Sequence, residues 1–365
     1  MLNGWFVFLG DAFFNASIVL SSFAAKLGAP NAVIGLLPAL LSAGSMIPQA
    51  FVAPYVARMP VKVVLYRRVA VLRVSSLAFI DLLLACFVLG LALNGLVTGF
   101  SSLPFWETVA KTIPIERRAA LFGGRNLVGG LLAFLAGILV RFLLGTPLPF
   151  PIPYAILFTL GTLAFGLSHE PPDEGRPAER IRLSLPLKDF AFRRFLRVRM
   201  LFAVASMTEP FYAAYAVRKL GQSSEIGLYL TLYTLASVLS NLLWVRLSQR
   251  YGSKLLILSG ASLGMVTPIL ALLLPPGAFG LVFLLQGTYL AALGLGSTTY
   301  LLNTADPQNR SSYIGLANTV VGVVSFSPVL GGLLADRLGY AAPLLVAAGC
   351  YGWGLYAGRK LEGRV

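Results

Sequence analysis

The sequence predicts an all-α integral membrane protein with twelve transmembrane helices in two pseudo-symmetric six-helix bundles. Three observations support this fold class: an apolar composition, a regular series of long apolar runs, and an internal repeat. The 365 residues are 57% hydrophobic and 12% charged, with a mean hydropathy of +0.79, whereas a soluble domain carries about 25% charged residues. Because a soluble core of this size cannot bury so much apolar side chain, lipid must be the solvent.

The apolar runs give the number of spans. A bilayer core about 30 Å thick requires roughly 20 apolar residues for each helix. Twelve such runs occur, separated by breaks rich in Gly and Pro: residues 4–25, 31–57, 63–86, 89–111, 117–144, 150–168, 195–217, 224–247, 254–274, 279–303, 311–334 and 339–358. A polar, Pro-rich segment at 169–193 is the predicted central loop. It separates an N-terminal bundle, residues 1–168, from a C-terminal bundle, residues 194–365.

The second half of the chain repeats the first with an offset of 192 residues. The clearest match is Ile34-Gly35-Leu36, which recurs as Ile226-Gly227-Leu228. Further on, one register also pairs Arg118, Gly123, Asn126 and Gly130 with Arg310, Gly315, Asn318 and Gly322. So long a period indicates a duplicated domain. In membrane proteins, two parallel repeats are typical of many secondary transporters.

The basic residues predict the orientation. The net charge is +15, and 23 of the 29 Lys and Arg residues fall on the side of the predicted topology that carries both termini and the central loop. By the positive-inside rule, both termini and this loop are expected in the cytoplasm of a cell inner (plasma) membrane. The excess also favours contact with anionic lipids. Membrane lipids are therefore expected partners, and nucleic acid is not.

A loop motif after the second span of each half carries a family resemblance. The second copy reads Val245-Arg-Leu-Ser-Gln249-Arg250-Tyr-Gly-Ser-Lys254. It resembles the pattern Gly-x-Leu-x-Asp-Arg-x-Gly-Arg-Lys of the major facilitator superfamily, although Gln249 here, and Ala57 in the first copy, replace the aspartate. The twelve spans and the central loop resemble the same family over the whole chain. The resemblance implies alternating access, a central cavity lined by spans 1, 4, 7 and 10, and no enzymatic activity.

Polar residues recur at helical spacing on these four spans. We expect them to line the substrate cavity, and they are Asp11, Asn15, Thr98, Glu209, Tyr212, Gln286, Tyr289 and Tyr300. Hydroxyl and amide groups also hold membrane helices together, with an average contribution of about 0.6 kcal/mol. A purely structural role therefore stays open for each of them.

Two acids within the spans are the candidates for proton coupling. Placing a charge at the bilayer centre costs about 2.5–3.5 kcal/mol, so an ionisable residue there usually has a function. Glu209 lies near the middle of span seven, beside the helix-breaking Pro210, and Asp11 lies in span one. A carboxylate in a partly dry cavity holds its proton more tightly than one in water, and can exchange it near neutral pH. Glu209 is the first candidate and Asp11 the second; a neutral or paired structural acid is the alternative for both.

Charges at the predicted cytoplasmic ends suggest a gate. Its candidate residues are Arg58, Lys62, Glu107, Lys111, Arg125, Arg250 and Lys254. Glu107 could pair with Lys111 one turn later or with Arg125 in span five. A single histidine, His169, and two cysteines in apolar runs give no metal-ligand spacing. No catalytic constellation, metal site or cofactor is therefore expected.

Together these features predict a secondary active transporter that moves a small molecule by alternating access, coupled to protons, as a monomer. An amphipathic drug, a sugar and a lipid all remain possible substrates, and import and export are equally open. A lipid or lysolipid carrier (a flippase) is one alternative function. A non-transporting membrane receptor on the same fold is another, although the short central loop offers little output surface.

Overall fold

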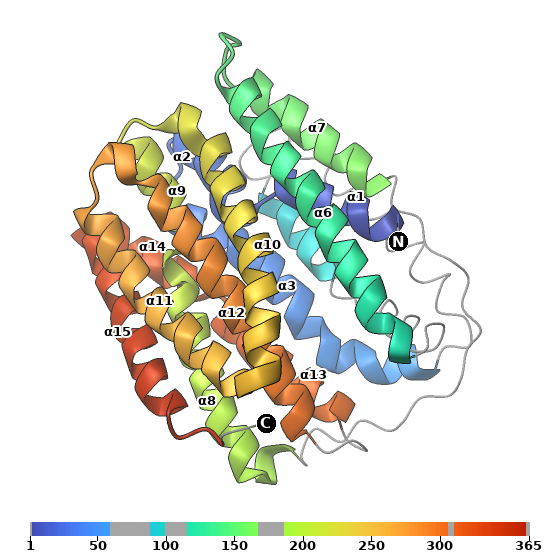
Figure 1. Cartoon of the computed structure of the whole chain (residues 1–365). Coiled ribbons are helices and arrows are strands. Elements are labelled where there is room, and N and C mark those ends of the chain that lie inside the picture. Colours follow the sequence, from blue (N-terminus) through green and yellow to red (C-terminus); the bar gives the residue numbers. More distant parts are fainter. Residues whose placement is uncertain (1, 59–87, 99–114, 167–185, 306–309, 363–365) are drawn as a thin grey trace.

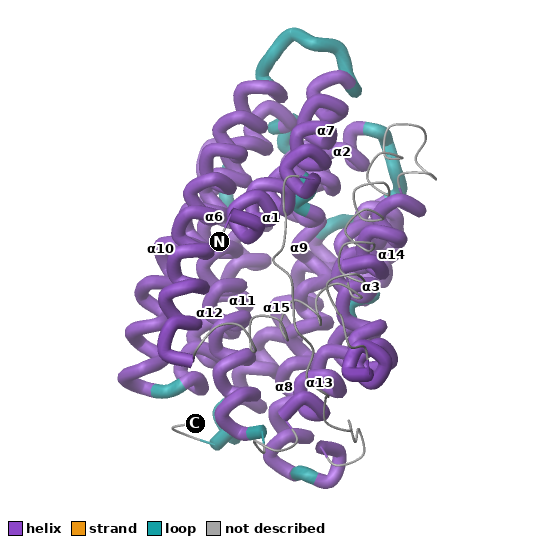
Figure 2. The backbone as a smooth tube through the Cα atoms, turned by 90° about the vertical axis from the view of Figure 1, so that its right-hand side faces the viewer, coloured by secondary structure: helices purple, strands orange, loops and turns teal. Residues whose placement is uncertain are grey.

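The protein is all-helical throughout the part of the chain that the computed structural model describes, residues 2–58, 88–98, 115–166, 186–305 and 310–362. The helices run side by side along the long axis of the molecule (Figures 1 and 2). In the first half they are α1 (Leu2–Phe13), a π-helical turn (Ala16–Leu20), α2 (Ser21–Lys26), α3 (Asn31–Arg58), Val88–Thr98, α6 (Ile115–Leu144) and α7 (Ile152–Gly166).

The second half contributes a longer described series. It consists of α8 (Phe190–Ala205), α9 (Glu209–Arg218), α10 (Ile226–Tyr251), α11 (Ser253–Leu273), α12 (Gly280–Thr304), α13 (Arg310–Val324), α14 (Ser327–Leu338) and α15 (Ala341–Gly358). Single-turn 3₁₀ helices at 186–188, 206–208, 223–225 and 276–278 join some of these elements. Most bounds agree with the predicted spans to within a few residues. The span predicted at 63–86 and most of that at 89–111 lie outside the described residues.

Within the described residues, six helical stretches are long and apolar enough to cross a membrane. They are Trp5–Lys26, Asn31–Pro48, Ser223–Tyr251, Ser253–Leu273, Pro276–Thr304 and Ser312–Leu338. Shorter apolar helices occupy Val88–Thr98, Val128–Leu144 and Ile152–Gly166. Large hydrophobic side chains remain exposed along these helices, for example Phe142 at 69% and Leu273 at 73%. Such a surface is expected where lipid is the solvent.

Three of the predicted spans are broken rather than continuous. Span one breaks at Asn15, whose side chain accepts a hydrogen bond from the Ile18 backbone N–H at 2.9 Å. Span seven breaks at Ser206–Thr208, just before Pro210 in the first turn of α9. The breaks in spans one and seven fall at matching positions of the 192-residue repeat. Span eleven breaks between α13 and α14, where Pro328 lies in the first turn of α14.

Two of the helix contacts that join the first half of the chain to the second are related by the repeat. α3 packs against α13 and α14, and α6 packs against α10. A Cβ atom at Gly35 would lie 2.0 Å from the carbonyl oxygen of Pro328, and one at Gly227 would lie 1.9 Å from the backbone nitrogen of Arg141. Only glycine permits backbones to approach so closely. The repeated Ile-Gly-Leu string therefore marks where the halves meet.

A second glycine pair shows the same relation. A Cβ at Gly130 in α6 would lie 2.4 Å from a methyl group of Val238 in α10. Its repeat partner Gly322 in α13 would meet the Cβ of Met46 in α3 at 2.9 Å. Val238 and Met46 are themselves 192 residues apart. The two interfaces between the halves thus use matching residues on both sides.

Candidate functional site

Glu209 stands where the two broken spans meet. It opens α9, directly after the break in span seven, and α9 packs against the π-helical turn of span one. The Ser17 side chain in that turn lies close enough to the Glu209 carboxylate to interact with it. An acid in the first turn of a helix also interacts favourably with the helix dipole. Ser17 is the repeat partner of Glu209, so one polar contact joins equivalent positions of the two halves.

Tyrosines from its own helix and from two other helices lie near this acid. Tyr212 shares a hydrogen bond with Thr208, with their oxygens 3.2 Å apart. Tyr233 of α10 and Tyr289 of α12 lie close enough to interact electrostatically with Glu209. We call Ser17, Glu209, Tyr212, Tyr233 and Tyr289 the Glu209 centre. It combines one half-buried acid with several hydroxyl groups, an arrangement suited to holding and passing a proton.

Two polar groups on α12 lack hydrogen-bond partners within the described part of the chain. Gln286 is 1% exposed, and neither its amide nitrogen nor its amide oxygen is paired. The Tyr289 hydroxyl, one turn later, is buried and makes no well-formed hydrogen bond either. Buried polar groups are normally satisfied. These two positions are therefore candidates for contact with a bound solute or water.

Asp11 and Thr98, two of the residues expected in the cavity, line a pocket whose described lining residues all belong to the first half. The pocket has a volume of about 140 Å³. It lies between α1, α3, the 88–98 helix and α7, and we call it the first-half pocket. The structure thus separates the predicted cavity residues into two groups, one around Glu209 and one around Asp11.

Two of the predicted cavity residues make structural contacts at other places in the fold. Asn15 caps the break in span one through its contact with Ile18. Tyr300 stacks on Phe195 with ring centroids 5.0 Å apart, and its hydroxyl accepts a hydrogen bond from the Glu362 backbone N–H at 3.3 Å. Spacing alone placed both on a polar helix face. The local helix break and the folded-back C-terminal segment give them other partners.

A polar cluster connects the halves at the end of the molecule where α3 begins. The Asp336 carboxylate in α14 accepts hydrogen bonds from the Asn31 backbone N–H at 3.1 Å and the Asn31 side-chain amide at 2.8 Å. It also accepts one from the Ala32 backbone N–H at 3.2 Å. Asp336 therefore caps the N-terminus of a helix in the other half of the chain. Asp336 is exposed, yet it binds across the interface.

Arg218 and Tyr340 complete this cluster. The Arg218 guanidinium donates to the Asn31 side-chain oxygen at 3.1 Å and to the backbone carbonyls of Ala25 and Ala29. The Tyr340 hydroxyl donates to the same Asn31 oxygen at 2.8 Å. We call Asn31, Arg218, Asp336 and Tyr340 the clasp. Asn31, which is 6% exposed, binds all three of the others and is its hub.

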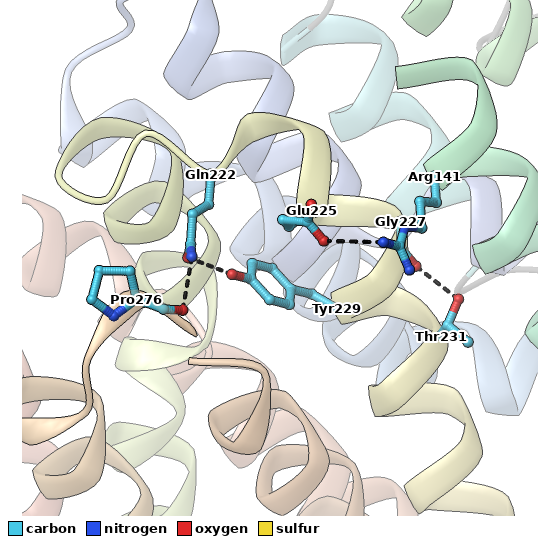
Figure 3. Close-up of polar contacts among 7 residues, drawn as sticks. All are labelled: Arg141, Gln222, Glu225, Gly227, Tyr229, Thr231 and Pro276. Atoms are coloured by element: carbon cyan, nitrogen blue, oxygen red, sulfur yellow. Dashed lines mark hydrogen bonds and ion pairs between the residues drawn. The ribbon is translucent and has the colours of Figure 1, made fainter. Parts of the chain in front are cut away.

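Among the described residues, the equivalent end of the α6–α10 interface has weaker polar contacts between the two halves than the clasp provides. Arg141 and Glu225 form an ion pair with a nitrogen–oxygen distance of 3.7 Å, and their side chains are 54% and 35% exposed (Figure 3). Beside it, Gln222 donates to the Pro276 carbonyl at 2.7 Å and accepts from the Tyr229 hydroxyl (Figure 3). These latter contacts lie within the second half. The ion pair across the interface is therefore weak by comparison with the clasp.

The predicted cytoplasmic gate is described only in part. Lys254 donates to the carbonyls of Arg359 at 2.8 Å and Leu361 at 2.6 Å, and so fastens the C-terminal segment. The Arg250 guanidinium lies over the Tyr251 ring at 5.3 Å. Arg58 and Arg125 lie in α3 and α6, but their side chains are outside the described part, as are Lys62, Glu107 and Lys111 altogether. The two described motif residues thus contact their own half of the chain.

Reasoning from the sequence missed Ser17, Asn31, Arg218 and Asp336. A signal existed for Ser17, because it is the repeat partner of Glu209. Arg218 likewise matches Lys26 across the repeat. The partners of Asp336 lie about 305 positions away in the sequence, too far for any local pattern. Among the described residues, no group of three or more His, Cys, Asp or Glu side chains could hold a metal ion.

The apolar helices that are long enough to span a membrane indicate a multi-pass membrane protein. Residues 200–357 match the family model described as the Major Facilitator Superfamily. The second half of the chain is therefore similar to this family, and the fold of the whole chain is shared with solved transporter structures.

Two solved structures illustrate the shared fold. A variant of the nucleoside transporter NupG superimposes with a TM-score of 0.73 at 15% identity, covering 99% of this chain and 98% of that one. A D-xylose-proton symporter superimposes with a TM-score of 0.72 at 14% identity, covering 99% of this chain and 96% of that one. A comparison with curated protein sequences finds no match. At these identities, the likeness concerns the fold.

Proposed function

We propose that this protein is a proton-coupled transporter of a small molecule, and that Glu209 carries the coupling proton. The observation that supports this assignment most directly is the packing of α9 against the π-helical turn of span one, which brings Ser17 close to Glu209 between the two broken spans. Ionisable residues inside membrane proteins commonly mark proton relays. Half-helix termini at a break in a span commonly form the ion and substrate sites of secondary transporters.

The coupling follows from where the proton binds. A charged Glu209 would accept a hydrogen bond from Ser17 strongly, and a neutral one would do so more weakly. Loading the proton therefore changes how firmly spans one and seven adhere, and these spans belong to opposite halves. The proton thereby biases the equilibrium between the two packings of the halves, which is what a coupled carrier requires. Asp11, in the first-half pocket, is the second candidate for this role.

The proposal also includes the number of spans, the two bundles and the orientation of the chain in the membrane. Twelve spans would form an N-terminal bundle (1–168) and a C-terminal bundle (194–365), joined by a central loop at 169–193. Both termini would face the cytoplasm of the cell inner membrane, so the clasp would lie at the outer end and hold it closed. The protein would work as a monomer in contact with anionic lipids. The proton symport named for the xylose carrier of the same fold supports the proposed coupling.

Uptake into proteoliposomes tests the proposal. Under an imposed pH gradient, Glu209→Gln should lose proton-driven accumulation, because a neutral amide cannot take up or release the proton. Exchange without a gradient should persist. Glu225→Gln is the matched control, since Glu225 is partly exposed and pairs only with Arg141 among the described residues. Normal accumulation by Glu209→Gln would refute the assignment of the proton to Glu209.

A further inference from the structure

The first-half pocket is separate from the Glu209 centre. Four helical segments of the first half form it, and its volume is about 140 Å³. The described lining residues are Asp11, Phe14, Leu41, Ser45, Leu91, Asn94, Thr98 and Phe165. None of the five residues of the Glu209 centre is among them.

Asn94 points to a ligand. Its side chain is 4% exposed and lines the pocket, yet its amide nitrogen has no hydrogen-bond acceptor among the described residues. The neighbouring Thr98 hydroxyl donates to the Asn94 backbone carbonyl at 2.8 Å. The Ser45 hydroxyl donates to the Ser42 carbonyl at 2.9 Å. A buried donor without an acceptor is destabilising, so the amide of Asn94 calls for an acceptor inside the pocket.

The rest of the lining defines the kind of ligand. Asp11 supplies a hydrogen-bond acceptor and is the only charged residue of the described lining. The walls are apolar and partly fixed by stacking, since Phe14 lies 6.0 Å from Phe165 and 5.4 Å from Phe158 between ring centroids. Small-molecule sites are typically apolar with a few well-placed polar groups. The arrangement suits a compact solute with both hydrogen-bond donors and acceptors.

We propose that the first-half pocket binds the transported solute and that this solute is a small neutral molecule with several hydroxyl groups. One hydroxyl accepts from the Asn94 amide, another donates to the Asp11 carboxylate, and the carbon skeleton packs against the two phenylalanines. The volume is well below the roughly 300–1,000 Å³ of sites for drug-sized ligands. A lipophilic drug or a lipid therefore fits the pocket poorly. The assignment rests on the proposed transport function, since it names that function's substrate class.

Thermal stabilisation of the purified full chain tests the assignment. The probes are glycerol, D-xylose and uridine as hydroxyl-bearing solutes, with tetraphenylphosphonium as a lipophilic cation and lysophosphatidylcholine as a lipid. At least one hydroxyl-bearing probe should stabilise the protein in a saturable manner. Asn94→Leu and Asp11→Asn should each weaken its apparent affinity about tenfold, which corresponds to about 1.4 kcal/mol. Thr162→Val, in α7 but outside the lining, should leave the affinity unchanged.

Several results would overturn the assignment. Stabilisation by none of the hydroxyl-bearing probes, or only by the cation or the lipid, would exclude the substrate class. Loss of binding in Gln286→Leu with full retention in Asn94→Leu would move the site to the second half. Asp11 is exposed, so Asp11→Asn keeps the test valid if Asn94→Leu fails to fold. Binding is measured without a gradient, so failure here is distinguishable from a failure of proton coupling, which appears only in the Glu209→Gln transport assay.

Discussion

The two interfaces between the halves share their scaffold but differ in how they are fastened. On the α3–α14 side, Gly35 admits the backbone of Pro328, and on the α6–α10 side Gly227 admits that of Arg141. The clasp then adds a network centred on the buried Asn31. The other side adds a single solvent-exposed ion pair at 3.7 Å.

This difference shows what duplication preserved and what later diverged. Close backbone contact is needed on both sides for the halves to pack, and so the glycines match across the repeat. The polar contacts are not copied: Asp336 and its repeat partner Leu144 differ in chemistry, as do Glu209 and Ser17. Among the described residues, the polar contacts that close this end of the molecule are therefore concentrated in one interface, where loss of Asn31 removes several of them at once.

The largest expected effect concerns the shared scaffold. Gly35→Ala and Gly227→Ala should each lower stability by about 3 kcal/mol, because the added methyl group meets backbone at about 2 Å and the helices must separate. Thermal unfolding of the purified variants measures this loss. Gly315→Ala is the control, since a Cβ there would meet nothing within 4 Å. Equal effects at all three positions would show that close packing is not what these glycines provide.

The next largest effect concerns the clasp. Asn31→Ala should lower stability by about 2 kcal/mol, since it removes the side-chain bonds to Asp336, Arg218 and Tyr340 at once. It should also increase the accessibility of a cysteine introduced nearby at Leu27 to a membrane-impermeant reagent. Arg337→Ala, at an exposed neighbour of Asp336, should leave both readouts unchanged. If Asn31→Ala keeps wild-type stability and accessibility, the clasp does not fasten the two halves of the chain together.

The smallest effect is expected at the ion pair. Arg141→Gln should change stability by no more than about 0.5 kcal/mol, because an exposed pair gains little in water and is screened by salt. The same thermal measurement at low and high salt checks this value. A loss as large as that of Asn31→Ala would mean that the two interfaces are fastened equally.

Much of the fold could be predicted from the sequence, because apolar length and the repeat report directly on lipid burial and duplication. The bend at span seven followed from Pro210, whereas the break at Asn15 depends on a side-chain cap that no periodicity shows. Glu209 was predicted because a buried charge is costly, but its partner Ser17 carries no such signal on its own. The Asn31–Asp336 contact joins positions that only the folded chain brings together.

The account depends most on the clasp being the main fastening between the halves at this end. Spin labels at Leu27 and Leu338, which are 42% and 69% exposed and lie in opposite halves, would report their separation by pulsed electron spin resonance. The account predicts one dominant short distance in the wild-type background and in Arg141→Gln, and a second, longer distance in Asn31→Ala. An unchanged distribution in Asn31→Ala, or an equal shift in Arg141→Gln, would contradict it.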